Sequence, residues 1–222
     1  MAEADLIRTV TEGSNFWRAR MHKESHSHDT AEELGPPPTC AAKYSNRMSP
    51  AGIVMFYGAL DPDTAVRESF GPARLEGYMA TVAQWATLRE LRVLDLSAEM
   101  RVPSLFDREH RHLRAAFIFL CSFVQDLNKP VVKDGREHIE YVPTRVATEY
   151  FRRRFRTEAG DPVQGILYRS AIREGGTCCV LFCDHHHCTE AVPGDSAPSE
   201  RWLVMVSGSA SRADLPPKQQ GP

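Results

Sequence analysis

The sequence predicts a single α+β domain, and three observations support this fold class. Short apolar or alternating runs, typical of strands, recur at residues 15–21, 53–57, 91–96, 165–170 and 178–183. Apolar residues spaced three and four positions apart predict helices over residues 108–124 and from Pro143 to Phe151. With 222 residues, of which 42% are hydrophobic, the chain has the size and composition of one globular domain.

The composition argues against several classes of protein. A formal net charge of -2 gives no electrostatic reason to bind nucleic acid or a membrane surface. No apolar run approaches the roughly 20 residues that a membrane-spanning helix needs. The first residues lack the basic and apolar regions of a secretory signal, so the six cysteines are expected to be reduced thiols. We therefore expect a cytoplasmic protein that contacts neither nucleic acid nor membrane directly.

The first predicted strand carries two arginines on one face. Alternation over residues 15–21 places Trp17, Ala19 and Met21 on one side and Phe16, Arg18 and Arg20 on the other. Arg18 and Arg20 should therefore project the same way. The alternative is an edge strand whose arginines face water.

The segment 46–70 brings three candidate functional residues together. Arg47 lies in a polar loop, Tyr57 ends the predicted strand 53–57, and Glu68 lies in a short helix predicted over residues 64–69. Loops, strand ends and helix starts hold side chains in place while leaving them open to a ligand. Asp63 is the expected N-cap of this helix, and Gly71-Pro72 its end. Arg67 and Ser69, which flank Glu68, are expected to point elsewhere on the helix.

The remaining segments give weaker indications. Residues 1–13 are predicted to be weakly helical, 22–46 a loop, 75–88 a strand or an irregular crossing, 139–142 a short strand and 202–206 an edge strand, and the last dozen residues disordered. The helix after Pro143 is expected to turn inward the side chains of Val146, Ala147, Tyr150 and Phe151.

Six polar residues predict a common chemistry: Arg18 or Arg20, Arg47, Tyr57, Glu68 and Ser170. Arginines around one carboxylate favour a phosphate-bearing substrate, and a tyrosine can stack on a flat heterocycle. A glutamate can stabilise positive charge that develops on a ribose, as in glycoside cleavage. Together they suit a dinucleotide with an N-glycosidic bond. The alternative is that Arg67 and Glu68 form a surface pair and Tyr57 is a core aromatic.

Other site motifs are missing or weak. The sequence contains no GxGxxG opening a βαβ unit, no P-loop and no GxSxG. Three histidines (His22, His26 and His28) fall in a predicted loop, and the Cys/His cluster of residues 183–188 packs all its ligands into one short stretch. Structural zinc sites usually join separated ligand pairs. No metal is therefore expected, and a zinc-binding interaction protein is the weakest alternative.

Several ordered segments resemble one family. They are FWRAR (16–20), LGPPP (34–38), NRMSPAGIVMFYGALDPDTAVRES (46–69), LRVLDLS (91–97), YVPTRVATEYFR (141–152) and GILYRSAIREGGTCCVLF (165–182). In this order they resemble the RES-domain family, the toxins of bacterial Xre–RES toxin–antitoxin modules. The expected RES domain spans residues 14–188, with a short segment 1–13 before it and a Pro/Ser/Gly-rich tail 189–222, partly disordered, after it.

The resemblance implies a fold similar to that of ADP-ribosyltransferases, with strands around an NAD-binding cleft and peripheral helices. It implies cleavage of the nicotinamide–ribose bond of NAD, with water or inorganic phosphate as acceptor, and growth arrest. Arg18 and Arg47 would bind the phosphates, with Arg20 as the alternative to Arg18. Tyr57 would line the nicotinamide side, Glu68 would be the catalytic carboxylate, and Ser170 would be the serine of the far strand.

The resemblance also implies a cognate Xre-type antitoxin that covers the cleft, and self-association is expected. Two residues depart from the family pattern: Arg145 stands where glutamine is usual, and Cys178 near a common asparagine. Either could reshape the cleft. Two further functions are carried as alternatives, an NAD-dependent protein ADP-ribosyltransferase and an inactive relative that binds a nucleotide.

Overall fold

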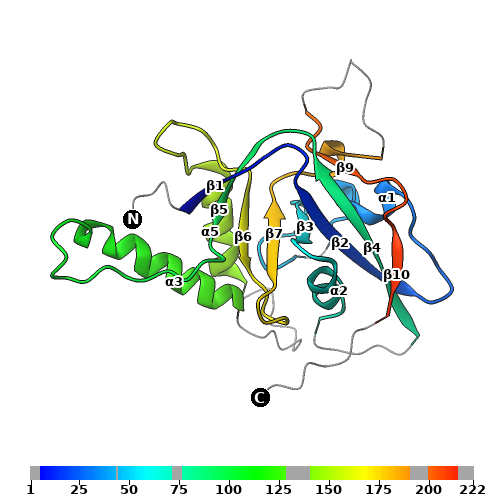
Figure 1. Cartoon of the computed structure of the whole chain (residues 1–222), viewed down its shortest axis with the longest axis horizontal. Coiled ribbons are helices and arrows are strands. Elements are labelled where there is room, and N and C mark those ends of the chain that lie inside the picture. The colour runs from blue at the N-terminus through cyan, green and yellow to red at the C-terminus, as the bar shows by residue number, and fades with distance from the viewer. Residues whose placement is uncertain (1–5, 44, 72–76, 129–140, 191–199, 215–222) are drawn as a thin grey trace.

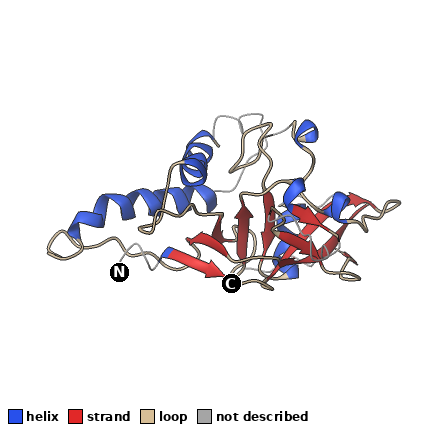
Figure 2. Cartoon of the chain, turned by 90° about the horizontal axis from the view of Figure 1, so that it is seen from above, coloured by secondary structure: helices blue, strands red, loops and turns tan. Residues whose placement is uncertain are grey.

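The computed structural model describes residues 6–43, 45–71, 77–128, 141–190 and 200–214. Within them the chain forms one mixed sheet of ten strands, flanked by helices (Figures 1 and 2), which confirms the α+β class. The strands are β1 (Ile7–Val10), β2 (Asn15–Lys23), β3 (Phe56–Ala59), β4 (Tyr78–Thr87), β5 (Leu91–Asp95), β6 (Gly165–Arg169), β7 (Thr177–Leu181), β8 (Cys188–Thr189), β9 (Leu203–Met205) and β10 (Ser211–Ala213). The α-helices are α1 (Ala31–Leu34), α2 (Pro62–Phe70), α3 (Arg114–Asn128) and α5 (Val142–Arg153), and the 3-10 helices are η2 (Thr39–Ala41), η3 (Arg111–Leu113) and η4 (His185–His187).

The sheet runs in the order β1-β5-β6-β7-β3-β2-β4-β9-β8, and β10 pairs with β4. Neighbouring strands are antiparallel, except that β5 runs parallel to β6 and β8 runs parallel to β9. Strands β2 and β4 pair over nine residues, from Asn15 opposite Ala86 to Lys23 opposite Tyr78. This order places β7 between β6 and β3, so segments far apart in the sequence meet at the centre of the sheet.

Strand β2 has the predicted alternation but is not an edge strand. It lies between β3 and β4, which excludes the alternative of arginines on an open edge. Arg18 donates to the Leu34 carbonyl at 2.8 Å, and Arg20 donates to the Glu33 carbonyl. Both arginines therefore project toward α1, as the alternation predicts.

Helix α2 begins two residues earlier than predicted. Its N-cap is Asp61, whose carboxylate accepts from the Thr64 backbone N–H at 2.9 Å, and Pro62 opens the helix. Proline suits the first helical position because its missing N–H needs no partner there. Asp63, the predicted cap, instead pairs with Arg67 at 3.0 Å one turn later.

Strand β3 begins at Phe56, three residues after the predicted start. It pairs with β7 from Phe56 opposite Leu181 to Ala59 opposite Cys178. Because β7 ends at Leu181, residues 53–55 have no partner strand on that side. Gly58 is required within β3, since a Cβ there would lie 2.8 Å from the Trp17 carbonyl oxygen.

Several weaker predictions were wrong. Residues 7–10 are strand β1 rather than helix, and the predicted loop 22–46 contains α1, which a capping box of Thr30 and Glu33 begins. Val142, predicted to end a short strand, instead opens α5. Strand β9, predicted to be an edge strand, pairs with β8 on its outer side. Strand β10 lies within the last dozen residues, which were predicted to be disordered. The predicted elements at residues 72, 75–76, 139–140 and 215–222 lie outside the described residues.

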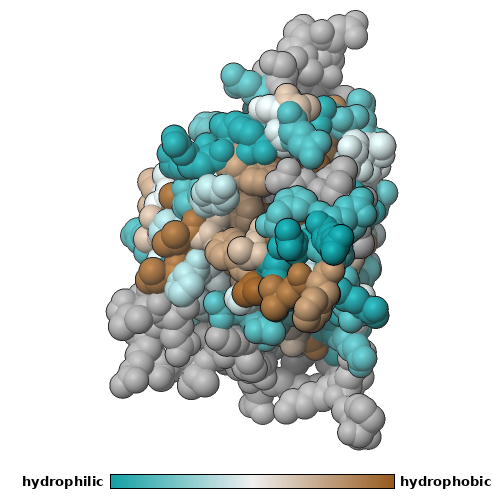
Figure 3. Space-filling model, turned by 90° about the vertical axis from the view of Figure 1, so that its left-hand side faces the viewer, coloured by the Kyte–Doolittle hydropathy of each residue, from teal (hydrophilic) through white to brown (hydrophobic). Residues whose placement is uncertain are grey.

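Helices α3 and α5 pack against each other at one side of the sheet (Figure 1). Helix α5 buries Thr144, Ala147, Thr148 and Phe151, so the prediction that Val146 and Tyr150 face inward was wrong: they are 65% and 51% exposed. Ile118 and Phe119 of α3 are exposed as well. This side of the molecule therefore carries several exposed apolar side chains, and Figure 3 shows apolar patches on it. None of the helices in the described ranges combines the length and the apolar composition of a membrane-spanning segment.

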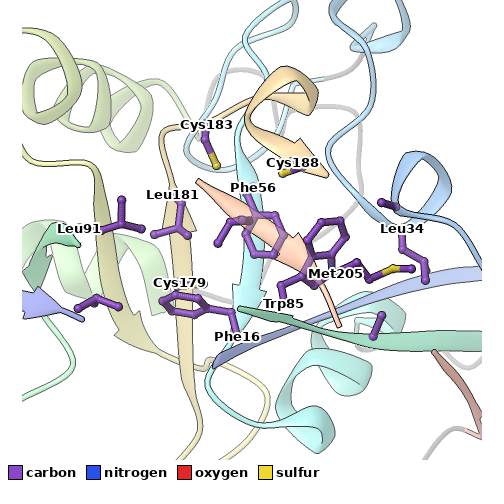
Figure 4. Close-up of a cluster of buried hydrophobic side chains, with 14 of the residues drawn as sticks. Phe16, Leu34, Phe56, Trp85, Leu91, Cys179, Leu181, Cys183, Cys188 and Met205 are labelled. Carbon is purple, nitrogen blue, oxygen red and sulfur yellow. The ribbon is translucent and has the colours of Figure 1, made fainter. Parts of the chain in front are cut away.

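The main core lies between the sheet centre and α1, and Figure 4 shows it. Trp85 of β4 is fully buried, with its ring centroid 5.6 Å from that of Phe56.

Trp85→Ala is expected to lower the free energy of unfolding by about 3–5 kcal/mol, because the cavity cannot close in a sheet packed on both sides. Urea denaturation measures this. Leu105→Ala, at a site 65% exposed, should change it by less than about 0.5 kcal/mol, and equal losses would contradict the assignment of Trp85 to the core.

Candidate active site

A pocket of about 230 Å³ opens where β2, β3, β6 and β7 meet helix α2. Its polar lining comes from Arg18, Tyr57, Glu68, Ser69, Tyr168 and Cys178, and its small residues are Ala19, Gly58 and Ala65. Three predicted site residues, Arg18, Tyr57 and Glu68, therefore meet in one cavity. Its volume is below the roughly 300–1,000 Å³ typical of a drug-sized ligand, so it suits one part of a larger ligand.

Arg18 is fixed at the pocket by the backbone. Its Nε donates to the Leu34 carbonyl at 2.8 Å, and a terminal nitrogen donates to the Tyr57 carbonyl at 2.6 Å. The guanidinium carbon lies 5.4 Å from the ring centroid of Phe56. Since a guanidinium has five N–H donors, these two bonds leave three for a ligand.

The pKa of Arg18 is lowered from 12.5 to about 10, chiefly by burial and to a smaller extent by nearby Arg20, while nearby cysteines act in the opposite direction. The guanidinium is still protonated at neutral pH. A fixed and partly desolvated cation of this kind binds an anion more strongly than an exposed one does, because water screens it less.

Ser170 is not among the residues that line the pocket, but it contacts Glu68, which does, although the two are 102 positions apart in the sequence. The Ser170 hydroxyl donates to Glu68 Oε1 at 2.6 Å. The same hydroxyl oxygen accepts from the backbone N–H groups of Ile172 at 3.1 Å and Arg173 at 2.9 Å. These two bonds orient Ser170, so that its own proton is directed at the carboxylate.

Tyr57 is a neutral, half-buried phenol. Its hydroxyl lies 2.9 Å from Ser49 Oγ, and burial raises its pKa from 10.0 to about 12 despite that hydrogen bond. Burial also raises the pKa of Tyr168. The two tyrosines therefore offer aromatic faces and neutral hydroxyls to a ligand, and neither supplies a negative charge at physiological pH.

Arg20 and Arg47 are not among the residues that line the pocket. Arg20 is exposed on β2 and donates to the Glu33 carbonyl. The Arg47 guanidinium lies 5.7 Å from the Tyr141 ring centroid, and the Arg47 carbonyl accepts from Thr144 Oγ1 at 2.6 Å. The loop of Arg47 nevertheless reaches the site through Ser49, which contacts Tyr57.

Sequence reasoning missed two polar residues of the pocket, Ser69 and Tyr168, and named Cys178 only as a departure that could reshape the cleft. Ser69 was expected to point away from the site, and this was wrong, since Ala65, Glu68 and Ser69 follow the i, i+3, i+4 spacing of one helix face. Tyr168 lies opposite Cys178 on neighbouring strands. Arg67 does point elsewhere, toward Asp63.

Of the two departures from the family pattern, Cys178 lies in the pocket and Arg145 lies on α5. Arg145 Nε donates to the Asn46 carbonyl at 3.0 Å, and its guanidinium lies 5.3 Å from the Tyr141 ring centroid. Its charge also lowers the pKa of Tyr57, as the charge of Arg18 does. Arg145 therefore adds positive charge near the site and holds the loop that carries Arg47.

Two of the histidines outside the pocket make side-chain contacts within the protein. His22 Nε2 lies 2.8 Å from Thr81 Oγ1, and His187 Nδ1 lies 2.7 Å from an Asp184 carboxylate oxygen. Among the residues that the structure describes, no three histidine, cysteine or acidic side chains come together as a metal site would need. The six cysteines form no disulfide.

A second, larger cavity of about 480 Å³ lies at the other end of β6 and β7. Its lining residues are Arg89, Arg152, Arg153, Pro162, Val163, Gln164, Phe182 and Trp202. Arg152 and Arg153 already pair with Glu149 of their own helix. Because no carboxylate, tyrosine or serine lines it, this cavity lacks the groups for bond cleavage, and the smaller pocket is the better candidate.

The buried thiols and phenols predict a loss of stability in alkali. Burial raises the pKa of Cys179 from 9.0 to about 12, and that of Tyr57 from 10.0 to about 12. As pH rises the unfolded chain loses these protons first, so the stability they contribute is complete below about pH 9 and is lost toward about pH 12. Urea denaturation should give a free energy of unfolding roughly 2–3 kcal/mol lower at about pH 10.5 than at about pH 8. Cys179→Ala should reduce this difference, and equal stability at both pH values would contradict the prediction.

Comparison with known proteins gives one match. The family model described as the RES domain matches residues 15–203, which is most of the chain. No curated protein and no solved structure matches the sequence.

Proposed function

Because the chain belongs to the RES-domain family, we propose that it degrades NAD by cleaving the bond between nicotinamide and its ribose. The observation that carries this proposal is the Glu68 carboxylate, held at 2.6 Å by Ser170 in a pocket that Arg18 and Tyr57 also line. One carboxylate, one fixed cation and two aromatic faces match the groups that a nicotinamide ribonucleotide presents.

Glu68 would act on the ribose. When the glycosidic bond breaks, its electron pair goes to the nicotinamide nitrogen, and the ring leaves as a neutral molecule. Positive charge then develops on the ribose carbon and ring oxygen, and a carboxylate held beside them stabilises this oxocarbenium-like state. Ser170 keeps the carboxylate in place through the bond to Oε1.

Arg18 would bind the phosphate next to this ribose. Its three remaining N–H donors suit a phosphate oxygen pair. The pocket of about 230 Å³ suits the nicotinamide riboside half of NAD, so the pyrophosphate and adenosine would extend toward the surface. We propose that Arg47, whose loop contacts Tyr57 through Ser49, binds a phosphate outside the pocket. Arg20 is the alternative to Arg18.

Tyr57 would lie against the nicotinamide. Because its pKa is raised, the phenol stays neutral and has no negative charge that would attract the positively charged pyridinium ring. It offers this ring a flat apolar face. The aromatic face then stabilises the bound ring, and Ser49 fixes the phenol by the 2.9 Å contact.

The acceptor of the ADP-ribosyl group is water or inorganic phosphate, which makes the protein a glycohydrolase or a phosphorylase. Two other outcomes belong to the same site: transfer of ADP-ribose to a protein, and NAD binding without turnover. A single measurement separates them. Free ADP-ribose or its 1-phosphate supports the proposal, a labelled protein band supports transfer, and bound but intact NAD supports an inactive relative.

At the level of the cell, we propose a cytoplasmic toxin that arrests growth by NAD depletion and that a cognate Xre-type antitoxin neutralises. The proposal includes a fold related to ADP-ribosyltransferases and self-association. It includes no metal and no direct contact with nucleic acid or membrane. The net charge of -2 supports the nucleic-acid part, since DNA-binding domains carry basic patches.

The test is NAD consumption by the purified protein with and without inorganic phosphate. Products are separated by chromatography, and a phosphate-dependent rate with ADP-ribose 1-phosphate as product identifies a phosphorylase. Induction of the wild-type gene should stop growth and lower cellular NAD. Intact NAD under both conditions would refute the proposed activity.

A further inference from the structure

Cys178 lies beside the carboxylate that the proposed reaction uses. Its Sγ is 3.5 Å from Glu68 Oε1, it lines the same pocket, and it is 1% exposed. It comes from β7, which lies between β6 and β3 at the centre of the sheet. The thiol is therefore held in a rigid element, with the Glu68 carboxylate and the Ser170 hydroxyl as polar neighbours.

The direction of this hydrogen bond follows from the charges. Burial raises the pKa of the Cys178 thiol, and the Glu68 charge and the hydrogen bond to Glu68 raise it further. The thiol therefore keeps its proton at physiological pH, whereas an ionised carboxylate can only accept. The shared proton belongs to sulfur, and Cys178 donates to Glu68.

Two donors thus converge on one oxygen of Glu68. Ser170 Oγ donates to Oε1 at 2.6 Å and Cys178 Sγ donates to it at 3.5 Å. Ser170 directly follows β6 and Cys178 lies in β7, so the two donors come from neighbouring strands. Among the residues that the structure describes, no hydrogen bond reaches Oε2. Two donors on Oε1 restrict rotation of the carboxylate and leave Oε2 to a ligand in the pocket.

We propose that Cys178 is a positioning residue for Glu68, which fixes the carboxylate for its action on the ribose. This inference rests on the proposed function. A positioned carboxylate lowers the barrier without binding the substrate more tightly, because the benefit is realised as charge develops in the transition state. Loss of the donor should therefore change kcat and leave KM nearly unchanged.

Three variants test the role in steady-state NAD cleavage. Cys178→Val is close in size but has no donor, Cys178→Ala removes the donor and some volume, and Cys178→Ser keeps a donor. The Val and Ala variants are expected to lose about five- to tenfold in kcat, with KM changed less than about twofold. Cys178→Ser should recover most of this loss. Thermal unfolding of each variant separates a fold defect from a positioning defect. Wild-type kcat in both donor-free variants would overturn the proposal.

A second measurement tests the contact without relying on activity. Iodoacetamide labelling is followed by mass spectrometry at Cys178 in the wild type and in Glu68→Gln, with exposed Cys40 as the internal reference. Removing the negative charge makes the thiol ionise more readily, so Cys178 should label at least about threefold faster in the variant while Cys40 is unchanged. Equal labelling of Cys178 in the two proteins would overturn the contact. If the wild type fails to cleave NAD but Cys178 labelling changes as expected, the proposed function has failed and the Cys178–Glu68 contact stands.

Discussion

Glu68→Gln is expected to lower kcat for NAD cleavage by about 10²–10³-fold. The amide has nearly the shape of the carboxylate, and its carbonyl oxygen can still accept the 2.6 Å bond from Ser170. What is lost is the negative charge next to the ribose, which matters most when positive charge develops in the transition state. The measurement is single-turnover NAD loss at saturating substrate.

The matched control is Glu158→Gln, which makes the same change at an exposed carboxylate far from the pocket. It should keep the wild-type rate. Glu68→Gln should also keep its thermal midpoint and still bind NAD in a titration, since the fold and the phosphate contacts are unchanged. Full activity of Glu68→Gln would refute the assignment of Glu68 as the catalytic carboxylate.

The elements that alternate strongly could be predicted from sequence. Strand β2, with its arginines on one face, and strands β5 and β6 came out within one or two residues of their predicted bounds. Side-chain alternation is a local property of the backbone, so it needs no knowledge of the partners. This is why the shared direction of Arg18 and Arg20 was predicted correctly.

The errors have a common physical cause, which is dependence on distant partners. The start of β3 depends on where β7 ends, because Phe56 pairs with Leu181, which lies 125 positions later in the chain. Which face of α5 is buried depends on how this helix packs against α3. Val146 and Tyr150 were predicted to face inward because they are apolar, but they lie at the surface. The cap of α2 is the exception, because Asp61-Pro62 is a local signal that outweighs Asp63.

The site itself could be predicted in its residue types but not in its contacts. The bond between Glu68 and Ser170 joins residues 102 positions apart, and the sequence order of the strands does not reveal that β7 lies between β6 and β3. Cys178 looked like a departure from a pattern, and only the sheet order places its thiol next to Glu68. Alternation likewise could not choose between Arg18 and Arg20, because both occupy the same face.

Arg18→Met is therefore the most informative substitution for substrate binding, and it is expected to raise KM for NAD at least about tenfold. It also removes two hydrogen bonds, to the carbonyls of Leu34 and Tyr57, and should lower the free energy of unfolding by about 2–3 kcal/mol. Methionine keeps much of the apolar stem, so packing against Phe56 is largely preserved. Both quantities are measurable on the same preparation, by initial rates and by urea denaturation.

Arg20→Met makes the same change two residues along β2, where the side chain is exposed and holds only the Glu33 carbonyl. Its effects on KM and on the free energy of unfolding should be several-fold smaller. Water already screens the charge of an exposed guanidinium, and water can take over the hydrogen bond that is lost. Rates must be taken well below the thermal midpoint of Arg18→Met, so that unfolding does not imitate weak binding. A larger KM effect for Arg20 than for Arg18 would exchange their roles, and the phosphate would then lie outside the pocket, on the exposed side of α1. Equal and small effects would instead assign the phosphates to Arg47 and its loop, which contacts the site through Ser49 and Tyr57.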